Sequence, residues 1–265
     1  MDGSELWRRR LSGPDAAWNQ IAALSGVEGR CLADTRANHE AGILVGTAGA
    51  RLAHVDERGE VAFVAGFDAA PGRDKWFTPW GGPPDTRSLT ENGDSVFANV
   101  HVGGVLRSRD EGATWQPTLD IREDIHRVVT AGEKVFAAGA HGVSISADGG
   151  DSWNRSAEGL HATYCRAVAV CGDALLVSAS DGPRGGRAAV YRSDLGGGGF
   201  ERCSKGLPEW FEGNVDSLAL DALPEGELAA FGTEDGELYV SGDQGRSWDR
   251  IATGLEGIAC VLTLP

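Results

Sequence analysis

The sequence has few positively charged residues and no long apolar segment. It holds 24 Lys and Arg against 39 Asp and Glu among 265 residues, which gives a formal net charge of -15 at pH 7. Binding to nucleic-acid phosphates requires clustered Lys and Arg, so this balance argues against a nucleic-acid partner. Nowhere do about 18 apolar residues follow one another, and the first residues lack the apolar core of a signal peptide. We therefore expect a cytoplasmic protein without a membrane partner.

Cysteine is also scarce. The five cysteines are an odd number, and none belongs to a CxxC pair. Neither a disulfide framework nor a four-cysteine zinc site is therefore indicated. The six histidines show no HxH or HExxH spacing. We expect buried free thiols, no metal and no cofactor.

Helical periodicity is rare, whereas glycine is abundant with 39 residues. Short apolar runs such as VFAAGA (135–140) and ELYVS (237–241) stand between turn residues. This pattern is typical of β-strands separated by tight turns. The composition therefore predicts an all-β protein.

One turn motif occurs three times, as SRDEGATW (108–115), SADGGDSW (146–153) and SGDQGRSW (241–248). We call these copies the aspartate turns; a fourth, degenerate copy has Leu195 in place of the Asp and Phe200 in place of the Trp. The intervals between copies suit four strands per repeat. Within each turn the carboxylate can accept hydrogen bonds from turn amides while the Trp packs beneath. We therefore predict a structural role for Asp110, Trp115, Asp148, Trp153, Asp243 and Trp248.

The aspartate turns resemble the Asp box of the bacterial neuraminidase repeat (BNR), which occurs in sialidases and in many non-enzymatic propellers. The resemblance covers nearly the whole chain and implies a β-propeller whose boxes lie on the face opposite the ligand site. The strongest motif would then point away from function, because a fold by itself does not settle an activity.

We predict one six-bladed β-propeller domain over residues 1–265. Four short elements precede each aspartate turn in the same order, and weaker repeats extend this pattern toward the start of the chain. The N-terminal segment parallels the last repeat, which predicts a blade shared between the two ends that closes the propeller and removes exposed sheet edges. A count of five or seven blades remains open. The expected blades are 27–66, 85–118, 124–156, 163–203, 214–251, and a composite of 257–265 with 3–22.

Alignment of the first strands places one charged residue of each contiguous blade at the opening of the central channel. Guanidinium groups offer forked donors that match carboxylate or phosphate oxygens, so this column indicates an anion-binding mouth. The alternative is that each arginine pairs with a nearby acid such as Glu28, Asp85, Glu123 or Asp124. The column consists of Arg30, Arg87, Arg127, Arg166 and Asp216.

Aromatic residues occur in the loops that lead into these first strands. Trp76, Trp80 and Trp210 could line a pocket for a sugar or an aromatic ligand, or could instead fix their own loops to the rim. His126, beside Arg127, is a further ligand candidate, although the period of two turns its side chain toward the packed blades.

The resemblance to sialidases implies arginines that grip a carboxylate, a Tyr nucleophile and an acid/base carboxyl group. The arginine column lacks the Arg-Ile-Pro signature, and among the tyrosines only Tyr164 is expected near the mouth, since Tyr191 and Tyr239 should point away. The catalytic candidates are Tyr164, Asp216 and Glu212. We favour a binding or assembly propeller that holds an anionic small molecule, an acidic peptide group or a protein partner at this mouth. A sialidase-like hydrolase or lyase acting on an acidic sugar is the alternative, so enzymatic activity stays open.

Overall fold

The computed structural model describes residues 3–10, 17–37 and 40–264, which are almost entirely β-strands and turns. The chain forms two compact units, Met1–Glu123 and Asp124–Pro265. Residues 11–16 of the expected composite blade and its last residue, Pro265, lie outside the described residues, as do residues 38–39 of the first expected blade.

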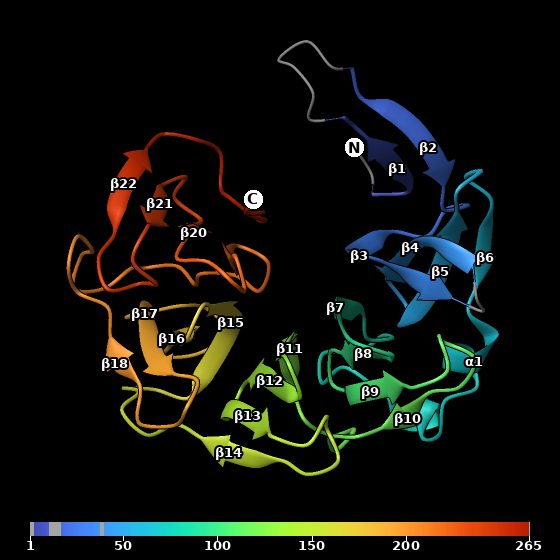
Figure 1. Ribbon diagram of the computed structural model, residues 1–265, viewed down its shortest axis with the longest axis horizontal. Helices are drawn as coiled ribbons and strands as arrows, with labels where there is room; N and C mark the ends of the chain where they lie inside the picture. The colour runs from blue at the N-terminus through green and yellow to red at the C-terminus, as the bar shows by residue number, and fades with distance from the viewer. Residues whose placement is uncertain (1–2, 11–16, 38–39, 265) are drawn as a thin grey trace. The chain divides into compact units, whose positions relative to one another are not determined.

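The first unit contains one sheet of two strands and two sheets of four strands (Figure 1). In each sheet, strands that follow one another in sequence pair antiparallel. The strands are β1 (Glu5–Arg8) with β2 (Asn19–Ala23); β3 (Gly29–Ala37), β4 (Glu40–Thr47), β5 (Arg51–Asp56) and β6 (Val61–Phe63); and β7 (Thr86–Asn92), β8 (Ser95–Val100), β9 (Gly104–Ser108) and β10 (Gln116–Pro117). A short helix α1 (Ala65–Asp68) and a 3-10 turn (Arg73–Lys75) connect the two larger sheets.

The second unit contains three sheets of four strands, again as antiparallel meanders. The strands are β11 (Ile125–Ala131), β12 (Lys134–Gly139), β13 (Gly142–Ser146) and β14 (Asn154–Ser156); β15 (Tyr164–Cys171), β16 (Ala174–Ser180), β17 (Ala189–Asp194) and β18 (Glu201–Arg202); and β19 (Leu220–Ala222), β20 (Ala229–Gly232), β21 (Leu238–Ser241) and β22 (Asp249–Ala252).

The five four-stranded sheets coincide with the five contiguous blades expected from the repeats, and only the last sheet runs a single residue past its expected end. Its first strand starts later than the sequence suggested. Asp216 lies in a turn before β19, where the Ala219 amide donates to the Asp216 carbonyl at 3.0 Å. The Asp216 carboxylate also accepts a bond from the amide of Ser217 at 2.9 Å, which stabilises a turn rather than a strand.

The expected first strand over residues 258–264 does not form. Within the second unit this segment makes separate contacts instead of a ladder: the Val261 amide donates to the Leu218 carbonyl at 2.9 Å, and the Thr263 amide donates to Asp221 Oδ2 at 2.8 Å. A backbone amide that donates to a carboxylate is not available for the regular hydrogen bonds between strands, so the pairing is interrupted. The shared blade between the two ends of the chain stays a prediction.

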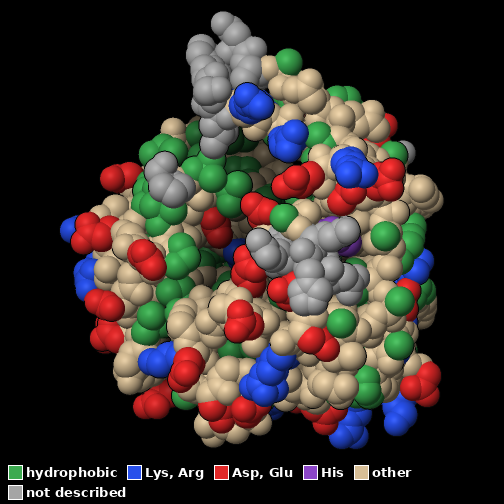
Figure 2. Space-filling model, turned by 45° about the vertical axis from the view of Figure 1, so that its right-hand side comes forward, with side chains coloured by type: hydrophobic (Ala, Val, Ile, Leu, Met, Phe, Trp, Pro, Cys, Tyr) green, Lys and Arg blue, Asp and Glu red, His purple; other side chains and the backbone are tan. Residues whose placement is uncertain are grey.

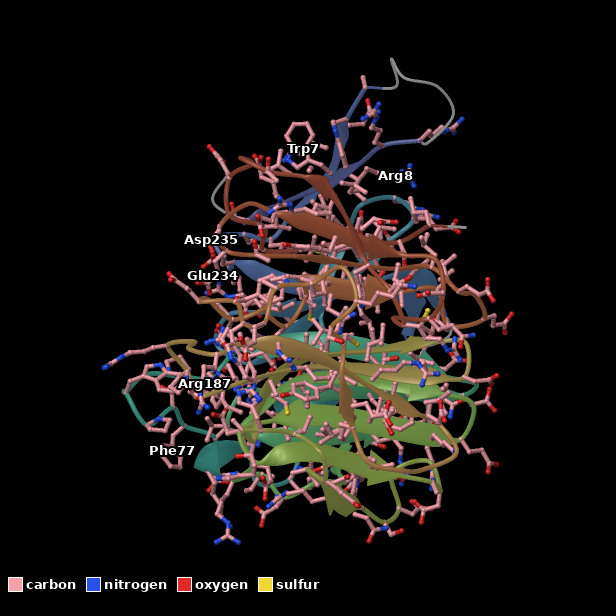
Figure 3. The ribbon with its side chains drawn as sticks, turned by 90° about the vertical axis from the view of Figure 1, so that its left-hand side faces the viewer. Trp7, Arg8, Phe77, Arg187, Glu234 and Asp235 are labelled. Carbon is pink, nitrogen blue, oxygen red and sulfur yellow. The ribbon has the colours of Figure 1, made fainter. Side chains whose placement is uncertain are left out.

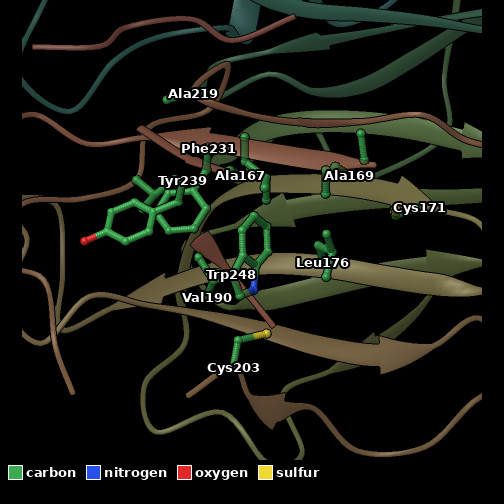
Figure 4. Packing of buried hydrophobic residues seen from close by; sticks show 14 of the residues in the cluster. Ala167, Ala169, Cys171, Leu176, Val190, Cys203, Ala219, Phe231, Tyr239 and Trp248 are labelled. Atoms are coloured by element: carbon green, nitrogen blue, oxygen red, sulfur yellow. The ribbon is translucent and has the colours of Figure 1, made fainter. Parts of the chain in front are cut away.

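The second strands carry the core. All seven residues of β16 are buried, and Trp248, only 3% exposed, packs in the cluster that contains Phe231 and Cys203 (Figure 4). The rings of Phe231 and Trp248 meet edge to face with centroids 4.9 Å apart. Aromatic side chains of this size dominate core energetics, and edge-to-face contact is a favoured geometry. The Trp of the third aspartate turn is therefore a core residue.

The aspartate turns share one hydrogen-bond pattern. In the first, Asp110 Oδ1 accepts from the Thr114 amide at 2.8 Å and Oδ2 from the Thr114 hydroxyl at 2.6 Å. The Ser108 hydroxyl accepts from the Gly112 amide at 2.8 Å, and the Trp115 indole donates to the Gly112 carbonyl at 3.0 Å. The other two turns repeat the carboxylate bonds. These carboxylates hold their turns, as the sequence suggested.

Candidate functional site

In the first unit, Arg30 of the arginine column is held by two carboxylates. Its Nη1 lies 2.7 Å from Glu28 Oε1, and its Nε lies 3.1 Å from Asp85 Oδ2. Both acids are among those expected for the pairing alternative, which therefore describes this position. Arg87, in β7, is half-buried and also has interaction partners within the chain.

Arg127, in β11, is the most deeply held member of the column. Its Nη1 donates to the Ser217 carbonyl at 2.8 Å and to the Leu220 carbonyl, and its Nη2 lies 3.2 Å from Asp221 Oδ1. The side chain is only 12% exposed. Burial lowers the pKa of Arg127, and the neighbouring Asp221 carboxylate opposes this change. Arg127 thus connects the first sheet of the second unit to the turn before β19.

Arg166, in β15, forms an ion pair at the surface of the same unit. Its Nη1 donates to Asp216 Oδ1 at 2.6 Å and its Nη2 to the Pro183 carbonyl at 3.2 Å. The Asp216 side chain is 42% exposed, whereas Arg166 is 20% exposed. Burial by itself lowers the pKa of Arg166, but the bond to Asp216 outweighs it and the pKa lies above its ordinary value. The Arg166 end of the pair is therefore mostly buried, and the Asp216 end is accessible to solvent.

Two buried polar atoms beside this ion pair lack a hydrogen-bond partner among the described residues. They are Arg166 Nε and Ser217 Oγ. Ser217 itself is 7% exposed, and its amide shares the Asp216 oxygen that binds Arg166. Leaving a buried polar group without a hydrogen-bond partner lowers stability by about 1–3 kcal/mol. Each of the two atoms can therefore form a hydrogen bond with a ligand.

Two aromatic side chains surround the same ion pair. The Arg166 guanidinium lies 5.8 Å from the ring centroid of Tyr164, and the Tyr164 ring lies 4.9 Å from that of His126. His126 is fully buried; its Nδ1 lies 2.7 Å from the Cys165 carbonyl and its Nε2 lies 3.3 Å from Asp124 Oδ1. His126 therefore packs between strands, as the period of two indicated, and Tyr164 is the ring nearer the ion pair.

We call Arg127, Tyr164, Arg166, Asp216 and Ser217 the arginine site. Five predicted ligand or catalytic candidates, counting His126, are thus brought together by the second unit. The missed participant is Asp221, which neutralises Arg127. Because Arg127 and Arg166 each have an acidic partner, the arginine site carries no excess of positive charge.

The two tryptophans of the 75–85 loop have different environments. Trp76 is 8% exposed and packs 5.7 Å from Phe67, with the Arg73 guanidinium 5.1 Å from its ring. Its place in the core favours the alternative that it fixes its own loop, and its ligand role stays a prediction. Trp80 is 66% exposed with His101 at 5.0 Å, so it remains available at the surface.

Trp210 and Glu212 lie together in a separate groove of the second unit, next to β22 and the β20–β21 turn. The groove has a volume of about 520 Å³. Phe211 between them exchanges two backbone hydrogen bonds with Ala188, at 2.8 and 2.9 Å, so the neighbours on either side point the other way. Tyr239 also lines this groove. The remaining polar lining comes from Asp235, Glu237 and Arg250.

The sequence could have indicated part of this groove. TEDGELYVS places acids on a turn and then an aromatic residue on a strand, but the motif reads equally well as an ordinary hairpin. Only the fold shows that the loop carrying Trp210 packs beside this hairpin. The three catalytic candidates are therefore divided: Tyr164 and Asp216 are at the arginine site, and Glu212 is in the groove.

No protein-family model matches the chain, and no curated protein sequence matches it. Solved structures do match it. An ancestral GH74 enzyme superimposes with a TM-score of 0.69 and 17% identity, covering 97% of this chain and 37% of that chain. The WD40 repeats of RRP9 give 0.66 and 14%, covering 97% and 76%. A chain of the nidogen/laminin complex gives 0.64 and 9%, covering 96% and 91%.

Identities this low show the fold alone. The six antiparallel meander sheets and these neighbours establish an all-β propeller fold, as the repeats predicted. The neighbours include glycoside hydrolases as well as WD40 repeats, so the fold is compatible with binding and with catalysis. Among the described residues, no helix is long and apolar enough to cross a membrane.

Proposed function

We propose that this protein is a binding or assembly propeller of the Asp-box type, and that it takes an anionic group at the arginine site. The observation that supports this proposal is the ion pair of Arg166 with the half-exposed Asp216, beside two buried polar atoms that have no hydrogen-bond partner in the described part of the chain. The shared bond pattern of the three aspartate turns supports the Asp-box family.

An anion reaches Arg166 by taking the place of Asp216. The Asp216 carboxylate occupies only one edge of the guanidinium, and rotation of this exposed side chain uncovers Nη1 and leads toward Nε. A ligand carboxylate or phosphate can then accept from Arg166 in the forked geometry that guanidinium favours and also from the Ser217 hydroxyl. Asp216 competes with the ligand, so affinity is set by the difference between the two anions.

The geometry supports binding better than catalysis. Asp216 Oδ1 already accepts hydrogen bonds from Arg166 and from the Ser217 amide. The acids of the aspartate turns hold their own turns, and Glu212 lies with the groove residues. A sialidase-like reaction would use Tyr164 as nucleophile, supported by its ring 5.8 Å from Arg166.

Two structures in assemblies, the nidogen/laminin and mitotic checkpoint complexes, further support a protein partner for this fold.

Isothermal titration of inorganic phosphate and of acetyl-triglutamate amide tests this proposal and separates a free anion from an acidic peptide. Asp216→Asn keeps the shape of the side chain but removes the competing charge, so binding should tighten about tenfold, since hydrogen bonds to charged groups contribute about 1.5–3 kcal/mol. Arg166→Ala should abolish it. Arg122→Ala, which removes an 83% exposed arginine, is the matched control and should change nothing. Equal affinity in the Asp216 and Arg166 variants would contradict the proposal.

A further inference from the structure

The groove beside Trp210 has two preformed walls. On one side, the paired backbone bonds between Phe211 and Ala188 fix the loop that carries Trp210 and Glu212. On the other side, the Gly236 amide donates to the Thr233 carbonyl at 3.1 Å and closes the turn that presents Asp235. A volume of about 520 Å³ lies between them. This is within the range of about 300–1,000 Å³ typical of ligand sites.

Arg250, the arginine that lines the groove, is already neutralised. Arg250 Nη1 donates to Glu237 Oε1 at 2.6 Å, and the Tyr239 hydroxyl donates to Glu237 Oε2 at 2.8 Å. Both Glu237 oxygens are therefore occupied. Burial and the bond to Glu237 raise the pKa of Tyr239 to about 12, so the phenol remains a donor. The charges of Arg250 and Glu237 cancel, so this pair adds no net charge to the groove.

Two carboxylates remain without an ion pair among the described residues, Glu212 on one wall and Asp235 on the other. Both are exposed. Figure 3 shows Asp235 next to Glu234 at the edge of the molecule, and the face drawn in Figure 2 carries many further acidic side chains. The whole chain has a net charge of -15, so its field adds to the local charge and attracts cations.

Aromatic rings line the same groove. Trp210, which is half-buried, lines the groove together with the buried Phe211 and Tyr239, whereas Glu212 and Asp235 are exposed. Two guanidinium groups already lie beside Trp210: Arg202 is 4.8 Å from its ring centroid, and Arg187, which is paired with Asp181, is 5.9 Å from it. Aromatic surfaces accommodate both the apolar stem and the cationic head of a long basic side chain.

We propose that this groove binds an arginine or lysine side chain on an extended basic segment of a partner protein. The stem packs along Trp210 and the charged head lies between Glu212 and Asp235. A divalent cation suits the groove less well, because such ions require six or more oxygen ligands and no aromatic side chains. This site is separate from the arginine site and takes a ligand of the opposite charge.

The test uses calorimetric titration of the full chain with acetyl-triarginine amide, and with acetyl-tricitrulline amide as the neutral isostere. Triarginine should bind and tricitrulline should not. Glu212→Gln and Asp235→Asn should each weaken binding about two- to fivefold, as expected for exposed ion pairs, and together about tenfold. Binding should also weaken with added salt, because the charges are exposed.

The control is Glu225→Gln, an exposed acid of the same unit at the β19–β20 turn and outside the groove. It should leave triarginine affinity unchanged, as should Arg166→Ala, which separates this site from the arginine site. Equal weakening by Glu225→Gln, absence of triarginine binding, or equal binding of tricitrulline would each overturn the proposal. Binding of cellotriose in place of triarginine would assign the groove to a neutral glycan instead and would also overturn it. Melting curves of all variants should coincide with that of the unaltered protein.

Discussion

At the scale of single residues, equivalent positions of the repeat have different roles. Arg127 and Arg166 both start a first strand, yet Arg127 is 12% exposed and bonded to two carbonyls, whereas Arg166 pairs with a half-exposed acid. The repeat pattern predicts the positions of both arginines. It does not predict their environments, because the segment opposite each of them comes from a different part of the chain.

Replacing Arg127 with Ala should therefore lower the free energy of unfolding, by about 3–5 kcal/mol, because the change leaves the mostly buried Asp221 without its cationic partner and removes the donor to two carbonyls. Urea denaturation measures the effect. Arg122→Ala serves as the exposed control with a change of about 0–1 kcal/mol. An unchanged midpoint for Arg127→Ala would show that this contact contributes nothing.

At the scale of elements, the aspartate turns repeat in bonding but not in packing. Trp115 and Trp248 are 1% and 3% exposed, and their indoles donate to glycine carbonyls at 3.0 and 3.1 Å. Trp153 is only partly buried, and its indole nitrogen has no partner among the described residues. The three turns have the same residues at the Ser, Asp, Gly and Trp positions, so the difference comes from what packs beneath each turn.

Trp248→Ala should cost about 3–5 kcal/mol, as large aromatic deletions in a core do, because it empties the space between Leu176 and Cys203. Trp153→Ala should cost clearly less, since part of its ring already faces solvent. Chemical denaturation of both variants under the same conditions gives the comparison. Equal losses would indicate that burial of the ring does not set the contribution of these turns.

The same turns should make stability depend on acid. Hydrogen bonds from Ser152 and Ser146 lower the pKa of Asp148 to about 2, and those from Ser247 and Ser241 do so for Asp243 against the opposing effect of burial. A carboxyl whose pKa is lower in the folded state stabilises the fold above its unfolded pKa near 3.8 and loses that contribution as pH falls through about 2. Stability should fall between these values, measured by urea titration at each pH, and Asp148→Asn should reduce the slope. A slope equal to that of the unaltered protein would contradict this assignment.

At the scale of the whole molecule, the sequence determined the repeat. Four-strand spacing, three turns of one pattern and the high glycine content define five sheets, because alternation and turn chemistry are local properties. Strong excess negative charge is likewise a property of composition, and Figure 2 shows it as acidic side chains over the surface.

Only the tertiary structure decided which charges cancel and which remain. Arg30 and Arg166 of the arginine column are each paired with an acid of their own unit. Among the residues that the structure describes, Glu212 and Asp235 have no ion pair, and they lie on two loops that line one groove. Such pairings depend on contacts between different repeats, and a repeat alignment contains no information about them. The sequence therefore determined the propeller and its turns, and long-range packing decided where a ligand can bind.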